Sequence, residues 1–565
     1  MGNAHSTPSS SNSRIISRKR SAGISKIGPS CCNLWNSWFT SSVASEETFC
    51  NDKCNIDHSS PKYAAQIPVI DNDAVVAYSA FLKAFPEYQL TSILDDLRES
   101  DFSRLDRTGE TYVDYMGGAL YPESLIRRYT AFLNNNVLGN THSVSNSSKL
   151  SSTCANEARD AVLSFFQAPP EYTVIFTSNA TGALKLVGEA YPFTNPSTYI
   201  LGADSHNSVH GIREFATRAG AKVCYIDSTE SGGFVESTAK AVLTHNRPKS
   251  HENASSLFAL TGQSNISNSK NPLSMIEFAS SMGYHTLLDA AALAPSSTFS
   301  LADHPQLDAM AVSFYKMFGF PTGVGALIAK KSFLAELHRP WFSGGNVDVV
   351  QVPGSLVTRS YDIHEQFEDG TINYLTLPII TDGLRFLSVY LPFLPLRLSS
   401  LLHFLTSSLS RLRHDQSGTP VVRILSRLPK CRLKSVGEQA DTGSTVSLIF
   451  LSPSGEMIPN TFIEHAATAQ SISLRTGCMC NPGGAAALLG VQDDMSLLYP
   501  GVTLKDFEQI VGRELGVVRV SLGLASSFRD VWKVIRFAAT IGNEKSRQVL
   551  WDRWMVNSEV VGKAM

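Results

Sequence analysis

The sequence around Lys316 and Asp289 is the strongest indication of a catalytic site in this chain. Lys316 follows an apolar, strand-like run at residues 309–314 and precedes a glycine-bearing turn. Such a lysine can be held away from water, and desolvation favours the neutral amine that attacks a carbonyl. Asp289 ends the strand-like run 285–289 about one βα unit earlier, where its carboxylate could face a pyridinium nitrogen. Together the two residues predict an enzyme that uses pyridoxal phosphate (PLP).

A turn between an expected strand and an expected helix could hold the phosphate of that cofactor. Residues 173–177 read as the strand and 183–190 as the helix, so free N–H groups at the helix start and the Thr181 hydroxyl would face an anion. Ser313, three residues before Lys316, could add a second hydroxyl. His206 follows another expected strand and could stack on the pyridine ring, although a histidine there also fits a structural role.

The loop at residues 475–483, Arg-Thr-Gly-Cys-Met-Cys-Asn-Pro-Gly, is the second chemical feature. Cysteines in a Gly- and Pro-bearing surface loop do not serve packing. Arg475 and a nearby cationic cofactor site would favour a thiolate, whereas the alternative is a pair of incidental surface thiols. Arg519, on an expected strand at 516–522, could hold a carboxylate bidentately or form a structural ion pair.

Short apolar runs alternate with helix-period segments from about residue 75 onwards. This alternation predicts an α/β fold whose mostly parallel sheet is covered by helices on both faces. Ligands then bind at the carboxyl ends of the strands, where Asp289, Lys316 and the turn 178–182 all fall. The expected strands of this sheet include residues 173–177, 198–201, 221–226, 256–260, 286–289 and 309–313. After about residue 357, long helices and strands at 445–450 and 516–522 predict a smaller α+β domain.

Charge, cysteine count and hydropathy narrow the class of protein. The net charge is −2 without a basic stripe, so nucleic-acid binding is not expected, and no metal site is predicted. Nine cysteines in 565 residues do not form a disulfide framework, which predicts a reducing compartment. The most apolar stretch, residues 386–396, is bounded by arginines and contains two prolines. We therefore expect a buried helix or a broken pair of helices there, and no membrane span.

Residues 1–72 form a Ser-rich, basic segment that predicts a disordered tail. Its first residues fit N-myristoylation at Gly2, with Cys32 as a second acylation site beside a basic cluster. This interpretation predicts a cytoplasmic protein that contacts a membrane surface through its acylated N-terminus. There are two alternatives. The segment could be an organelle presequence that directs the protein to mitochondria, or a solvated tail that carries no targeting signal.

Taken together, these segments make the chain resemble the class V aminotransferase family of PLP fold type I. Within that family it resembles the cysteine desulfurases, above all the N-terminal domain of the molybdenum cofactor sulfurases. The resemblance spans roughly residues 105–535 and rests on Gln-Ser-Asn at 263–265, Ser-Phe-Tyr-Lys at 313–316 and Arg-Thr-Gly-Cys-Met-Cys at 475–480. Further matching segments are residues 139–143, 207–214 and 367–371.

The resemblance implies a seven-stranded, mostly parallel sheet in a large domain at residues 120–356. A small domain at 357–565 would carry the cysteine loop, and the segment 73–119 would pack against it. The family also implies a homodimer. Asn346 stands where the family usually has a threonine whose hydroxyl reaches the phosphate of the partner subunit, so an amide would take that role.

Site roles also follow from the resemblance, position by position. Lys316 would bind PLP covalently and move protons, while Asp289 would pair with the ring nitrogen beneath a stacked His206. The phosphate would bind Ala180, Thr181 and Ser313. Asn265, Arg475 and Arg519 would bind the substrate amino acid. Three alanines follow Asp289, which leaves the hydrogen bond to the ring oxygen of the cofactor without an assigned donor.

The implied reaction is removal of sulfur from L-cysteine. Cys480, five residues after Arg475, matches the desulfurase nucleophile, which keeps the sulfur as a persulfide while alanine leaves. We expect the loop to be mobile, since it must visit the cofactor and then deliver sulfur. The molybdopterin-binding domain of molybdenum cofactor sulfurases would follow this fold, but the chain stops at Met565. The acceptor is therefore the molybdenum cofactor or a separate acceptor protein.

Two other functions fit the same residues. One is a class V aminotransferase or lyase, for example one similar to selenocysteine lyase, that uses the cofactor without forming a persulfide. The other is a non-catalytic, membrane-associated scaffold. The lysine–acid pair argues against a scaffold, which has no need of it.

Overall fold

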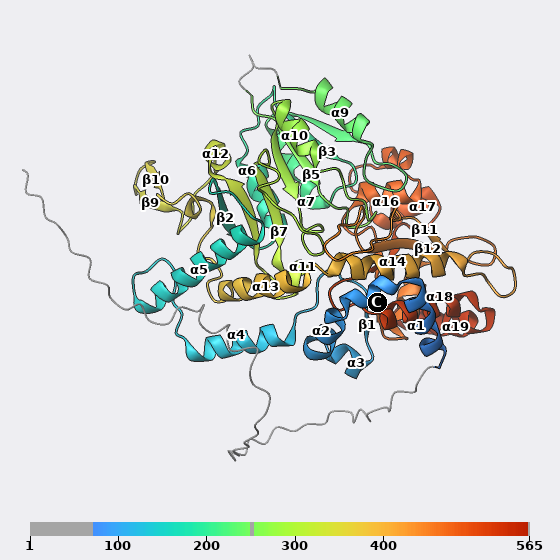
Figure 1. Cartoon of the computed structure of the whole chain (residues 1–565). Coiled ribbons are helices and arrows are strands. Elements are labelled where there is room, and N and C mark those ends of the chain that lie inside the picture. Colours follow the sequence, from blue (N-terminus) through green and yellow to red (C-terminus); the bar gives the residue numbers. More distant parts are fainter. Residues whose placement is uncertain (1–71, 249–253, 563–565) are drawn as a thin grey trace, which may run out of the picture. The chain divides into compact units, whose positions relative to one another are not determined.

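In the computed structural model, which describes residues 72–248 and 254–562, a sheet of seven short, largely buried strands organises the first half of the chain (Figure 1). The strand order is β2-β8-β7-β6-β5-β3-β4, and β8 alone runs antiparallel to its two neighbours. The strands are β2 (Tyr172–Thr177), β3 (Thr198–Gly202), β4 (Lys222–Ile226), β5 (Leu257–Thr261), β6 (His285–Asp289), β7 (Ala309–Ser313) and β8 (Gly325–Lys330). The expected mostly parallel, seven-stranded sheet is thus confirmed.

Alternate residues of each strand enter two different hydrophobic clusters, as a two-residue period requires. Ile175, Leu201 and Leu287 pack on one face of the sheet. Helices α6 (Ala180–Ala190), α8 (Ile212–Arg218) and α12 (Lys331–Glu336) cover that face. Val174 and Ile200 pack on the other face, under α5 (Asn146–Phe165), α9 (Glu236–His245), α10 (Ser274–Ser281) and α13 (Leu377–Tyr390). Both faces are therefore buried, which explains why these strands read as continuous apolar runs.

The carboxyl ends of the six strands that run in the same direction lie along one edge of this sheet. Thr261 of β5 pairs with Asp289 of β6, which pairs with Ala311 of β7. The residues that directly follow β2, β3, β5 and β7 consequently lie beside Asp289. This edge is where a doubly wound sheet binds ligands.

A second, antiparallel sheet forms in the C-terminal part. Its order is β11 (Val422–Ile424), β12 (Thr445–Phe450), β15 (Val517–Ser521) and β14 (Arg475–Gly477). In this sheet Arg475 of β14 pairs directly with Arg519 of β15. Helices α14 (Leu394–Arg411) and α18 (Phe528–Gly542) pack on one face, and α16 (Pro482–Leu489) and α17 (Leu504–Val511) on the other. Helices α15 (Asn460–Thr468) and α19 (Glu544–Gly562) complete this part.

The first described helices pack against this C-terminal part. They are α1 (Asn72–Ala84), η2 (Pro86–Thr91), α2 (Ile93–Asp101) and α3 (Arg104–Thr108), followed by β1 (Thr111–Tyr112). Strand β1 pairs in parallel with β13 (Ile472–Ser473). Arg98 of α2 forms an ion pair with Asp530 of α18, with Nη1 2.7 Å from Oδ2. The boundaries expected at residues 119 and 356 remain predictions, because one hydrophobic cluster continues across both.

The apolar stretch at 386–396 is a broken pair of helices, one of the two expected forms. Helices α13 and α14 meet at an angle of 64°, and no single described helix is long and apolar enough to cross a membrane. Helix α13 packs on α5 (Figure 1). Gly2 and Cys32, the expected acylation sites, lie outside the described residues.

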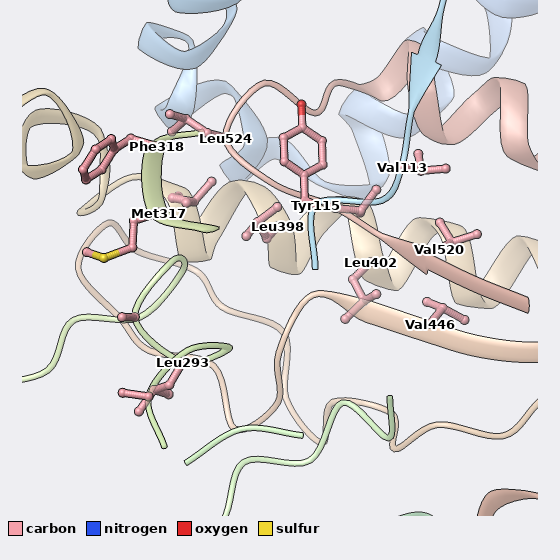
Figure 2. Close-up of a cluster of buried hydrophobic side chains, with 14 of the residues drawn as sticks. Val113, Tyr115, Leu293, Met317, Phe318, Leu398, Leu402, Val446, Val520 and Leu524 are labelled. Carbon is pink, nitrogen blue, oxygen red and sulfur yellow. The ribbon is translucent and has the colours of Figure 1, made fainter. Parts of the chain in front are cut away.

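The residues after Lys316 anchor it in the core. Helix α11 (Phe314–Phe318) carries Lys316, and its Met317 and Phe318 are almost fully buried. Figure 2 shows these two side chains in a cluster that also contains Leu398 and Leu402 of α14. Val446 of β12 and Val520 of β15 continue the cluster into the second sheet. Packing on this scale fixes the backbone from which the lysine projects.

Candidate active site

A cavity at the carboxyl edge of the large sheet brings together most of the residues singled out in the sequence. Its lining comes from the turn after β2, the segments after β3 and β5, the end of β6 and the start of α11. The predicted residues in the lining are Ala180, Thr181, His206, Asn265, Asp289, Ser313 and Lys316. Residues scattered over more than a hundred positions are thus neighbours, because parallel strands end together.

Lys316 reaches into this cavity from the first turn of α11. Burial lowers the pKa of its amine below the ordinary value of 10.5. Asp289 opposes this shift, whereas Arg519 and Arg475 add to it. A larger fraction of neutral, nucleophilic amine is present at neutral pH than on an exposed lysine.

Asp289 and His206 face the same space. Asp289 is buried, and its Oδ1 accepts a hydrogen bond of 3.1 Å from the Ala291 N–H. The Nδ1 of His206 accepts from the Ser208 N–H at 3.1 Å, so that nitrogen carries no proton. Burial lowers the pKa of His206, with Asp289 acting in the opposite direction. A neutral imidazole can stack on an aromatic ring without placing a second cation beside Lys316.

Hydroxyl and N–H groups gather at the N-terminus of α6. Asn179 caps this helix by accepting from Gly182 N–H at 2.9 Å, and Ala180 N–H donates to Ser313 Oγ at 2.8 Å. Thr181 Oγ1 lies 2.7 Å from Ser208 Oγ. Ser208 was not predicted from the sequence, although it follows His206 by two residues. The group suits an anion, since the helix dipole adds to the donors.

Gln263 is a second cavity residue that sequence reasoning assigned no role. It follows β5, is fully buried, and neither atom of its amide has a hydrogen-bond partner among the described residues. The amide lies against Gly443, where an added Cβ would come within 2.4 Å of Nε2. A buried, unpaired amide is costly, so a bound group with a polar atom would stabilise it.

Three charged side chains form a cluster next to the cavity. Arg519 is 1% exposed, and its Nη2 lies 2.6 Å from Asp114 Oδ1. Arg475, half-exposed, places Nη2 2.8 Å from the other oxygen of Asp114. Arg519 Nη1 also donates to the backbone oxygen of Asn265 at 3.0 Å, while its Nε has no partner among the described residues. The cluster keeps one net positive charge, which fits a substrate carboxylate.

Asn265 connects the cavity to the cysteine loop. Its Nδ2 donates to Met479 O at 2.7 Å, and its Oδ1 accepts from Asn481 Nδ2 at 3.1 Å. One amide hydrogen of Asn265 therefore remains for a substrate. The backbone N–H of Asn207, next to His206, donates to Cys480 O at 2.7 Å. The loop is thus hydrogen-bonded to the cavity rim through two of its carbonyl groups. Its mobility during the reaction stays a prediction.

Cys480 and Cys478 occupy different surroundings. Cys480 is exposed, although it is not among the cavity-lining residues. Cys478 is partly buried and packs against the hydrophobic cluster that contains residues of α16 and α17. Burial, followed by the nearby Glu508, raises the pKa of the Cys478 thiol, so less of this thiol is in the reactive thiolate form at neutral pH. The assignment of Cys480 as the nucleophile stays a prediction.

Asn346 lies outside the cavity, at the turn before β9 (Val347–Val350). Its Oδ1 accepts from Ser343 N–H at 2.9 Å. Its Nδ2 donates to Ser343 Oγ at 2.9 Å and to Asp369 Oδ1 at 3.1 Å. Both amide hydrogens are committed within the chain, which leaves no donor for the phosphate contact predicted from the sequence.

The strand order of the large sheet and the position of Lys316 at its carboxyl edge define an α/β protein of PLP fold type I. Solved structures share this fold. A cysteine desulfurase from Thermococcus onnurineus NA1 aligns with a TM-score of 0.62 at 20% identity, covering 79% of this chain and 97% of that one. The cysteine desulfurase CsdA from Escherichia coli aligns with a TM-score of 0.59 at 18% identity, covering 81% and 98%.

The chain belongs to the aminotransferase class-V family, whose model matches residues 111–395. This family is PLP-dependent. Among curated proteins, the molybdenum cofactor sulfurase of Arabidopsis thaliana is 33% identical over 496 residues, which are 81% of this chain and 60% of that protein. The human molybdenum cofactor sulfurase is 31% identical over 471 residues, 79% of this chain and 51% of that protein. The chain thus spans half to three fifths of these relatives.

Proposed function

We propose that the protein is a PLP-dependent L-cysteine desulfurase of the molybdenum cofactor sulfurase type, which holds mobilised sulfur as a persulfide on Cys480. One observation carries this proposal. Lys316 and Asp289 line a single cavity, and the rim of that cavity is hydrogen-bonded to the backbone of Cys480 at Asn207. A lyase that forms no persulfide would not need a cysteine loop fixed at this place.

The donor set of the cavity fits PLP. Lys316 would hold the aldehyde carbon, Asp289 the ring nitrogen, and the N-terminus of α6 with Ser313 the phosphate. The unpaired amide of Gln263 would supply a hydrogen-bond partner for the ring oxygen, the contact that the alanines after Asp289 leave open. PLP bound there would supply a sink for the electrons left when the α-proton of an amino acid is removed.

The protein's own groups then have defined tasks. The amine of Lys316, with its lowered pKa, takes the α-proton and later returns it. Asp289, whose Oδ1 accepts from the Ala291 N–H, would face the ring nitrogen of bound PLP and would favour its protonated form. Arg519 orients the substrate through its carboxylate, using the unpartnered Nε.

The thiolate of Cys480 attacks the sulfur of L-cysteine. The new bond joins the two sulfur atoms, and the bond between Cβ and sulfur of the substrate breaks. The electron pair of the broken bond stays on Cβ, which takes up a proton, so alanine leaves. The sulfur is oxidised to the persulfide level as the carbon is reduced, and no external oxidant is needed.

The sulfur acceptor we propose is the molybdenum cofactor, reached directly or through a separate acceptor protein. The relatives named molybdenum cofactor sulfurase support this choice. The exposed position of Cys480 supports transfer to a molecule outside the chain.

We also propose a homodimer and a cytoplasmic location. Exposed apolar side chains cluster around the hairpin of β9 and β10 (Val357–Arg359), where Val352 is 84% and Tyr361 is 93% exposed. A patch of this kind marks a protein interface, and a second copy of the chain is the partner we propose. Contact with membranes through an acylated Gly2 rests on the N-terminal sequence pattern alone.

The test is to incubate the purified protein with PLP and L-cysteine and to measure alanine and protein-bound persulfide together. We expect equal amounts of both in the first turnover. Cys480→Ala should abolish persulfide and alanine while the absorbance of the bound cofactor persists, and Cys478→Ala should retain both products. Alanine formation by the Cys480→Ala variant would support the lyase instead. A protein that binds no borohydride-reducible PLP would support the scaffold.

A further inference from the structure

Asp204 is a buried carboxylate that none of the steps above uses. It follows β3 by two residues and accepts four hydrogen bonds. Ser264 Oγ at 2.6 Å and Asn481 Nδ2 at 2.7 Å donate to Oδ1. The Gly233 N–H at 2.8 Å and the Ser267 hydroxyl donate to Oδ2. No lysine or arginine forms a salt bridge with it in residues 72–248 and 254–562, so neutral donors alone stabilise the charge.

Asn481 joins this carboxylate to the cysteine loop. Its side chain is fully buried, and its Oδ1 caps α16 by accepting from Gly484 N–H at 2.9 Å. Its Nδ2 donates to Asp204 and to the Asn265 side chain. One amide therefore holds the start of α16, the end of β3 and the cavity rim together.

The glycines after Asn481 permit this close approach. A Cβ at Gly483 would lie 2.2 Å from Ala203 O, and a Cβ at Gly484 would lie 2.4 Å from Asp204 Oδ1. Helix α16 can rest on the end of β3 only because both positions lack a side chain.

The backbone of the loop is unusual directly before Asn481. Met479 and Cys480 have φ angles of +56° and +54°, a left-handed conformation that non-glycine residues seldom adopt. Each of their carbonyl oxygens accepts a hydrogen bond from the cavity rim, one from Asn265 and one from Asn207. Such a conformation persists only where its surroundings fix it.

We propose that Asp204 and Asn481 are positioning residues that clamp the Cys480 loop to the cavity rim, so that the thiol meets the substrate sulfur from a fixed place. The inference rests on the proposed desulfurase function and deepens it. Neither residue touches the reacting atoms; both act through the backbone of Met479 and Cys480. A displacement of about 1 Å can slow a positioned reaction by about 100-fold.

The decisive variant is Asn481→Ser. Serine is a good helix cap, so α16 keeps its N-cap, but its hydroxyl cannot reach both Asp204 and Asn265. Asp204→Asn releases the clamp from the opposite side and serves as a second variant. The matched control is Thr503→Ala, which removes the cap of the neighbouring helix α17 and leaves the clamp untouched.

Two readouts are measured on the PLP-loaded protein. Hydrogen exchange measures how firmly the loop is held, through the exchange rates of the Asn207 amide and of the amides in segment 477–484. A single-turnover assay gives the rate of persulfide formation, and the cofactor absorbance gives the cysteine concentration at half saturation.

We expect Asn481→Ser to accelerate exchange at the Asn207 amide and to slow persulfide formation by about 100-fold. The half-saturating cysteine concentration should change by less than about threefold, since substrate binding is not the step affected. Thr503→Ala should change none of these. Unchanged exchange in Asn481→Ser would overturn the clamp, and an unchanged persulfide rate with a released loop would overturn its positioning role. If the unaltered protein forms neither persulfide nor alanine, the proposed function fails, while the exchange data still decide whether the clamp exists.

Discussion

Arg519 and Asp114 form a buried ion pair in which Nη2 lies 2.6 Å from Oδ1, at the edge of the cavity that contains Lys316. The other oxygen of Asp114 binds Arg475, which stands opposite Arg519 in the antiparallel pair of β14 and β15. One carboxylate thereby holds two arginines that would otherwise repel each other, and the arginines keep capacity for a second carboxylate.

Removing the buried carboxylate of Asp114 should destabilise the protein strongly, whereas removing the half-exposed Arg475 should not. Asp114→Asn leaves the Arg519 charge buried without a counter-charge, so we expect the free energy of unfolding to fall by about 3 kcal/mol. Arg475→Ala removes a half-exposed partner, and we expect a loss below about 1 kcal/mol. Urea denaturation of the two apo variants measures both values. Equal losses would show that Arg519 does not depend on Asp114.

Covalent attachment of PLP should be specific to Lys316. Borohydride reduction followed by peptide mass spectrometry should find the cofactor on Lys316 in the unaltered protein and on no residue in Lys316→Ala. Lys270 is the matched control, because burial lowers its pKa to about 8 and thus leaves it nucleophilic as well. Lys270→Ala should keep attachment at Lys316. If PLP were found on Lys270, the lowered pKa of an amine would be enough to select the attachment site, and the geometry of the cavity would not be required.

The lowered pKa of Lys316 should appear in the pH dependence of stability of the apo protein. The unfolded chain binds a proton up to about pH 10.5, while the folded chain releases it at a lower pH. The destabilisation is complete below the folded pKa, and stability rises between that pKa and 10.5. Lys316→Met should lack this rise. Denaturation curves of both proteins from pH 7 to 10.5 give the difference, and parallel curves would argue against a desolvated amine.

Gln263 should matter to the cofactor and not to the fold. Gln263→Leu removes a buried amide without a partner, so the apo protein should be as stable as the unaltered one or more stable by about 1 kcal/mol. The affinity for PLP should fall by about tenfold, because the ring oxygen loses its hydrogen bond. Thermal unfolding and fluorescence titration with PLP give the two values. Unchanged affinity would place the amide outside the cofactor contacts.

The exposed hairpin should govern dimerisation. Val352→Lys places a charge in the apolar patch, so we expect a dimer in the unaltered protein and a predominantly monomeric variant at micromolar concentration. Light scattering coupled to size-exclusion chromatography gives the masses. Lys505→Glu, on the distant and exposed start of α17, is a charge-change control that should leave the mass unaltered. If the unaltered protein and Val352→Lys have the same mass in solution, the hairpin does not belong to the dimer interface.

Local sequence was enough to predict the large sheet and the residues at its carboxyl edge. Lys316, Asp289 and His206 each follow or end a buried strand, and parallel strands necessarily bring such positions together. Asp114 could not be found in this way, because its partner Arg475 is 361 residues away in the chain. Gln263 and Asn481 look like ordinary polar loop residues until burial shows which of their amide atoms are paired. The hydrogen bonds that hold the Met479 and Cys480 carbonyl groups could not be predicted either, because their donors lie far away in the chain. The mobility of the loop, which was inferred from the chemistry, stays a prediction.

The side chain of Cys480 is exposed, whereas Met479 before it and Asn481 after it are buried. The sulfur atom of Cys480 is thus open to solvent between two buried neighbours. Under the proposed function, a sulfur acceptor can therefore reach this atom from solvent without entering the cavity of Lys316, because Cys480 does not line that cavity.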